Sequence, residues 1–255
     1  THEAAGEAHA EACLRYEARL RHHVLGLQWS GSSYAYEAIG STISCHALAY
    51  AQVRGVPSRP AAEDFYLLNK LAKMGPVQSV PGAPMRVSGR VSDRVPFGTG
   101  AALGTAVERG QMPLCYEPQL FQWLRLTLCL LDNALVAQSD LGAALETVAH
   151  PSRVWLAGIE ERGLRAVIDA VQATGLPLAK RRRRLRDQVD AFATLKLMHA
   201  WRSRGLPDVP LEDAVARSPF CLDAGITSSP SASKDDLKRI VGAFAALELR
   251  FEFES

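Results

Sequence analysis

One lysine and four arginines in succession, "KRRRR" at residues 180–184, form the feature of the sequence best suited to binding chemistry. With one further arginine, this basic tract consists of Lys180, Arg181, Arg182, Arg183, Arg184 and Arg186. Guanidinium groups present a fixed fork of N–H donors that matches carboxylate and phosphate oxygens. The tract therefore predicts binding of RNA or another polyanion through its negatively charged backbone.

The position of the tract strengthens this prediction. It follows Pro177 and so falls in the first two turns of a predicted helix, where the helix dipole favours negative charge. Each cation placed there costs from a few tenths of a kcal/mol to about 1 kcal/mol. Five successive helical residues sweep more than one turn, so we expect Arg181 or Arg182 to lie beside the buried face. Such a helix start is more stable with an anion bound.

A second group of arginines recurs at intervals of four in the segment from Gly75 to Thr99. The group consists of Arg86, Arg90 and Arg94, each followed by valine. In an extended chain these side chains would share one face, because side chains alternate with period two. Unstructured segments of this length are uncommon in compact domains unless they are functional or disordered. We interpret the segment as an extended loop with a basic edge, which contacts either nucleic acid or a neighbouring subunit.

Other interpretations of the basic tract remain open. A charge run is often a solvated helix end, partly neutralised here by acids such as Asp187 and Asp190. A short basic run also resembles a nuclear-import signal, although such signals favour flexible segments. A different class of function is a structural or scaffold subunit of a larger assembly, such as a virion or an organellar complex, with no ligand of its own.

Motifs that would indicate catalysis are missing from the sequence. It has no Walker A loop, no G-x-S-x-G turn and no H-E-x-x-H motif. The glycine-rich stretch 98–104 follows no predicted strand, and the pair Glu146 and His150 has no second metal-binding pair beside it. We predict a non-enzymatic protein without metal or cofactor. A helical enzyme is the weaker alternative and would need a deep cavity with convergent polar groups.

The elements that must position these residues are helices. Apolar residues recur every three or four positions along most of the chain, which predicts an all-α fold, formed as one domain over residues 1–255 with a lobe division within 75–116. One continuous helix is predicted from Leu178 to Arg204. The other predicted helices begin near residue 1, at 34, after Pro60, and at 100, 118, 140, 152, 164 and 233.

Composition sets the remaining limits. Apolar residues make up 47% and charged residues 22% of the chain, typical of a folded globular protein. The net charge is only +2, so any attraction for anions must come from local clusters. Five scattered cysteines without a C-x-x-C pair favour a reducing compartment, the cytoplasm or nucleus. The most apolar segment is interrupted by Arg125 and Asp132, so no membrane span is predicted, whereas self-association or a larger complex is.

Overall fold

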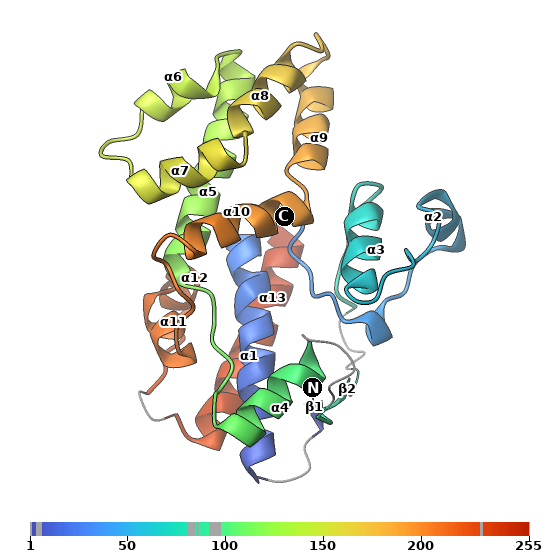
Figure 1. Ribbon diagram of the computed structural model, residues 1–255, viewed down its shortest axis with the longest axis vertical. Coiled ribbons are helices and arrows are strands. Elements are labelled where there is room, and N and C mark those ends of the chain that lie inside the picture. The colour runs from blue at the N-terminus through green and yellow to red at the C-terminus, as the bar shows by residue number, and fades with distance from the viewer. Residues whose placement is uncertain are drawn as a thin grey trace. The chain divides into compact units, whose positions relative to one another are not determined.

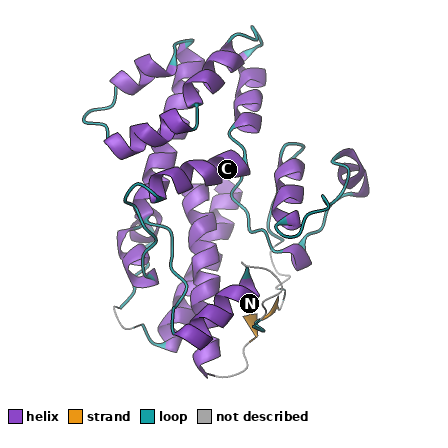
Figure 2. Cartoon of the chain, viewed as in Figure 1, coloured by secondary structure: helices purple, strands orange, loops and turns teal. Residues whose placement is uncertain are grey.

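The computed structural model describes residues 2–3, 7–80, 85, 87–91, 98–229 and 232–254 (Figure 1). Helices account for most of the described chain, as Figure 2 shows, and the prediction of an all-α multi-helix fold is confirmed. The strands of the described part are β1 (His2–Glu3) and β2 (Val87–Ser88), which pair in parallel.

The chain divides into two compact units. Unit 1 comprises Thr1–Gln28, Ala35–Pro118 and Asp208–Ser255, and unit 2 comprises Trp29–Tyr34 and Gln119–Pro207. The chain thus leaves unit 1 after Gln28 and again after Pro118, and it returns at Ala35 and at Asp208. A lobe division within residues 75–116 remains a prediction.

Unit 1 is built around the long helix α1 (Glu7–Trp29). Helix α13 (Lys234–Glu254) lies beside it and is tied to it by an ion pair between Arg21 and Glu248 (Figure 1). Helix α4 (Thr99–Arg109) packs on α1 through a cluster of buried side chains. The cluster consists of Ala12, Cys13, Tyr16, Leu103 and Ala106.

Two short helices that the sequence did not predict complete this part of unit 1. They are α11 (Leu211–Arg217) and α12 (Pro219–Asp223), which share Ser218 as the residue between them. At the C-terminal end, the predicted start of α13 is confirmed. The Ser233 hydroxyl accepts from the Asp236 amide while the Asp236 carboxylate accepts from the Ser233 amide. This is the reciprocal pattern of a capping box.

The helix predicted from residue 34 to residue 54 is wrong. Extended chain, a 3-10 turn η1 (Gly40–Thr42) and the short helix α2 (Ala47–Gln52) occupy this region. The glycine, serines and threonine in it are weak helix formers, because they lose backbone entropy or bond locally to the backbone. The next helix, α3 (Glu63–Ala72), follows Ala62 in a left-handed conformation, so Pro60 does not open it as predicted.

Unit 2 consists of α5 to α10, and its helix positions largely agree with the prediction. Asp140 and Ser152 cap the second and third of these helices by accepting hydrogen bonds from Ala143 and Trp155 amides. Helix α7 packs on α10, and α8 packs on α6, α7 and α9. The bounds are α5 (Pro118–Ala137), α6 (Leu141–Glu146), α7 (Arg153–Glu161), α8 (Leu164–Gln172), α9 (Leu178–Gln188) and α10 (Ala191–Arg202).

The prediction of one continuous helix from Leu178 to Arg204 is also wrong. The helix is interrupted between the end of α9 at Gln188 and the start of α10 at Ala191. The Asp190 carboxylate accepts hydrogen bonds from the Phe192 and Ala193 amides at 3.1 and 3.0 Å and caps α10. Capping of this kind stabilises a helix start by about 1 kcal/mol. The basic tract therefore belongs to a short helix of its own.

Helix α5 is the one helix of the described chain with the length and composition needed to cross a membrane. In the most apolar 18-residue stretch of this helix, 44% is buried inside the structure. Core helices of globular proteins pass the same test, so this is weak evidence for a membrane span and none is assigned.

Candidate functional site

Helix α9 presents a group of exposed cations, which we call the α9 basic surface. It consists of Lys180, Arg183, Arg184 and Arg186. Within the described part of the chain, none of these four forms an ion pair. Leu185 is buried on the opposite side of the helix. The cations are therefore available to an external anion.

The two remaining arginines of the tract have other roles. Arg181 is half-buried and its Nε atom is shielded from solvent, which confirms that one arginine lies beside the buried face. Arg182 donates from Nε and Nη2 to the two carboxylate oxygens of Asp132 on α5, at 2.6 and 2.7 Å. This forked ion pair links α9 to α5. Binding of an anion by all six residues remains a prediction, and the four residues of the α9 basic surface are the ones that neither burial nor the Asp132 carboxylate engages.

The start of α9 carries no negative charge of its own. Pro177 precedes the helix and provides no side-chain cap, and the first turn contains no acidic residue. The amides of Lys180 and Arg181 both donate to the Pro177 carbonyl. The amides of the first turn carry partial positive charge from the helix dipole, and they add to the field of the basic surface.

Tyr34 holds the last turn of α9 through a hydrogen bond to the backbone. Its hydroxyl donates to the Arg186 carbonyl at 3.0 Å. Burial, followed by the fields of Asp187 and Asp190, raises the pKa of Tyr34 well above its usual range. The phenol therefore stays protonated as a hydrogen-bond donor. Tyr34 positions the helix and, being buried, is not a platform on which a base could stack.

Charge is divided unequally between the two units. Unit 2 contains 13 lysines and arginines against 8 aspartates and glutamates, a net charge of +5. Unit 1 contains 16 against 19, a net charge of −3. The low net charge of the whole chain hides this separation, and α9 supplies six of the 13 cations of unit 2.

The second predicted arginine group is described only in part. Arg90 is exposed, two residues after β2. Arg86 and Arg94 lie outside the described residues, as do residues 81–84, 92–93 and 95–97 of the predicted extended loop. Alignment of the three guanidinium groups on one face remains a prediction.

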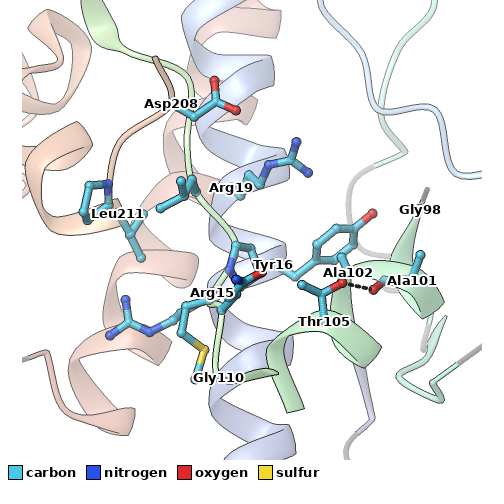
Figure 3. A pocket seen from close by; sticks show the side chains of 15 residues that line it. Arg15, Tyr16, Arg19, Gly98, Ala101, Ala102, Thr105, Gly110, Asp208 and Leu211 are labelled. Atoms are coloured by element: carbon cyan, nitrogen blue, oxygen red, sulfur yellow. Dashed lines mark hydrogen bonds between the residues drawn. The ribbon is translucent and has the colours of Figure 1, made fainter. Parts of the chain in front are cut away.

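Unit 1 contains a cleft of about 730 Å³ that the sequence did not indicate (Figure 3). Helices α1 and α4 and the chain around residues 110–114 and 208–211 form its walls. Most of its lining is apolar, from side chains such as Ala101, Met112 and Leu211. Its polar groups are Tyr16, Thr105, Gln111, the Asp208 carboxylate and two arginines of α1, Arg15 and Arg19. The volume falls in the range of small-molecule sites.

A buried polar cluster connects α1 to the junction of α11 and α12. The His22 ring is fully buried, and its Nε2 lies 2.7 Å from the Ser218 hydroxyl oxygen. That hydroxyl donates to the Ala214 carbonyl, so His22 Nε2–H is the donor to it. Burial raises the pKa of the nearby Cys221 thiol to about 12, so this thiol is protonated at pH 7. The hydrogen bonds of the cluster tie α1 to α11 and α12.

His22 should make the protein sensitive to acid. Burial, with a smaller contribution from the charge of His23, lowers the pKa of His22 to about 3, whereas the unfolded value is about 6.5. The unfolded state then binds the proton more tightly, so the free energy of unfolding is complete above about pH 6.5 and falls as the pH drops toward 3. At pH 5 the loss is about 2 kcal/mol.

Urea unfolding at pH 7 and pH 5 measures this loss. The His22→Gln variant keeps an N–H donor for Ser218 but does not titrate, so its stability should change much less between the two pH values. The exposed His199→Gln is the matched control and should behave like the wild type. An identical pH dependence in His22→Gln and wild type would show that His22 is not responsible.

The described part of the chain contains no group of three or more His, Cys, Asp or Glu side chains placed to hold a metal ion. Comparison of the chain with known proteins gave no match among protein-family models, curated proteins or solved structures. The candidate sites of the molecule are the α9 basic surface and the cleft of unit 1.

Proposed function

We propose that this protein is a non-catalytic, nucleoprotein-like nucleic-acid-binding protein, and that unit 2 binds the phosphate backbone, with RNA as the favoured partner. The observation that carries the proposal is the α9 basic surface. Four exposed cations without a counter-charge lie along a short helix whose start is uncapped, in a unit of net charge +5. Arg182 and Tyr34 hold this helix in place.

The arrangement suits a polymer better than a single small anion. The four cations of the α9 basic surface occupy different sides of the exposed part of the helix, because successive residues are rotated by about 100°. A chain of phosphates can meet several of them in turn. Each neutralised phosphate releases counterions, so four contacts with a single strand predict a slope of about −3 for log affinity against log salt.

The double variant Arg183→Ala with Arg184→Ala tests the proposal. Loss of two phosphate contacts should reduce the magnitude of the salt slope by about 1.4 and weaken binding about 25-fold in 0.1 M salt. Fluorescence anisotropy with a labelled single-stranded RNA of mixed sequence, titrated with salt, measures both quantities. Circular dichroism should be unchanged, since both side chains are exposed.

A charge-matched control comes from the same unit. Arg153 and Arg165 are exposed and lie on α7 and α8, and changing both to alanine removes the same net charge. This control should retain the wild-type salt slope. Equal losses of RNA affinity in the two variants would show that the net charge of unit 2, not the position of the arginines, determines binding. Undiminished binding by the α9 variant, or a nucleic-acid-free oligomer from the wild type, would instead favour a scaffold subunit.

A further inference from the structure

Arg15 and Arg19 lie one helical turn apart on α1 and both line the cleft of unit 1, but their surroundings differ (Figure 3). Arg15 donates to Glu11 at 2.8 Å and to Glu212 at 2.7 Å. Two carboxylates therefore neutralise its charge and fix it toward α11. In Figure 3 the Arg19 side chain leaves α1 in a different direction.

Arg19 has no carboxylate partner within the described part of the chain. It is half-buried and lines the cleft together with Tyr16 and the Asp208 carboxylate, with which it forms no ion pair. Its positive field opposes the rise in pKa that burial causes at Tyr16 and at Cys115, so its charge acts inside unit 1. A partly desolvated cation without a counter-charge is unfavourable, and an anion bound beside it would relieve that cost.

We propose that this cleft binds a small organic monoanion, with the anionic head on Arg19 and an apolar body against Ala101, Met112 and Leu211. One unpaired guanidinium matches one negative charge, and a carboxylate accepts its fork of donors. The apolar lining excludes a bare inorganic ion as the best ligand. The site is independent of the α9 basic surface, because it lies entirely within unit 1.

Titration calorimetry of the full chain with three probes tests the site. Octanoate carries both the head and the body, 1-octanol carries the body alone, and acetate carries the head alone. Octanoate should bind at least about tenfold more tightly than either, since a charge-assisted hydrogen bond contributes roughly one decade in affinity. Equal affinity for octanoate and octanol would overturn the role of Arg19. Equal affinity for octanoate and acetate, or no binding of octanoate, would overturn the site itself.

Variants locate the binding. Arg19→Gln should reduce the affinity for octanoate to that for octanol. The control Lys234→Gln removes the same charge from an exposed residue of unit 1 outside the cleft and should have no effect. Ala101→Leu keeps every charge but fills part of the cleft, so it should weaken octanoate and octanol together. Octanoate affinity that survives both Arg19→Gln and Ala101→Leu would place its binding elsewhere and overturn the proposal.

Discussion

Replacement of Arg21 by methionine is expected to lower the free energy of unfolding of unit 1 by about 3–5 kcal/mol. Arg21 lies between two buried carboxylates and forms an ion pair with each of them. Its Nη1 donates to Glu248 at 2.7 Å, and its Nη2 and Nε donate to Glu17 at 3.1 and 3.2 Å. Glu17 and Glu248 are only 5% and 7% exposed. Without Arg21, two negative charges would remain together in the interior.

The pKa of Arg21 reflects the carboxylates that surround it. Burial opposes the charge on Arg21, but the fields of Glu248, Glu37 and Glu17 outweigh burial and keep the pKa of the guanidinium above its usual value. The large cost of the variant is therefore the cost of orphaned carboxylates and not the net contribution of the ion pairs, which is smaller.

Thermal unfolding followed by circular dichroism measures the effect. Lys238→Met, which removes an exposed ion pair with Asp235 on the same helix, should leave the midpoint unchanged. Adding Glu17→Gln and Glu248→Gln to Arg21→Met removes the stranded charges and should recover most of the stability. No recovery in the triple variant would mean that the shape of Arg21, not its charge, is what the core requires.

Local sequence signals predicted the features that neighbouring residues determine. The helix that begins after Ser233 was predicted because a capping serine, an aspartate three residues later and an apolar period occur together. The break at Asp190 has a similar signal, an aspartate before an apolar run, but the strong period across it concealed the break. The prediction of a helix over residues 34–54 was wrong for the opposite reason. Its apolar spacing was given more weight than the weak helix formers in the segment.

The candidate sites depend on contacts that no local signal contains. The partner of Arg182 is Asp132, 50 residues away, and the partner of Arg21 is Glu248, 227 residues away. The sequence indicated that one arginine of the basic tract lies beside the buried face. It could not indicate that a carboxylate of α5 pairs with another arginine. The cleft of unit 1 is assembled from three separate regions of the chain, so its unpaired Arg19 became visible only in the folded structure.

The packing of unit 2 predicts a second large effect, at a glycine of α7. A Cβ atom on Gly158 would lie 2.1 Å from Nε1 of Trp201 and 2.4 Å from its Cδ1. Trp201 is fully buried, and its Nε1 donates to the Trp155 carbonyl at 3.0 Å. Gly158→Ala should therefore displace the indole and break a buried hydrogen bond. Overpacking and an unsatisfied indole N–H together outweigh the better helix propensity of alanine, for a net loss of about 3 kcal/mol.

Tryptophan fluorescence is the appropriate measurement, because all four tryptophans of the chain, including Trp201, belong to unit 2. Gly158→Ala should lower the denaturation midpoint that this signal reports. Gly242→Ala makes the same change within α13, where open space surrounds the new methyl group, and should stabilise the chain by up to about 1 kcal/mol. Because α7 packs on α10 and α8 packs on α9, the Gly158 variant should also lose RNA binding at temperatures where Arg183→Ala with Arg184→Ala remains folded. Unchanged fluorescence and stability in Gly158→Ala would show that Trp201 has room to move, and that the core of unit 2 is less tightly packed than its contacts indicate.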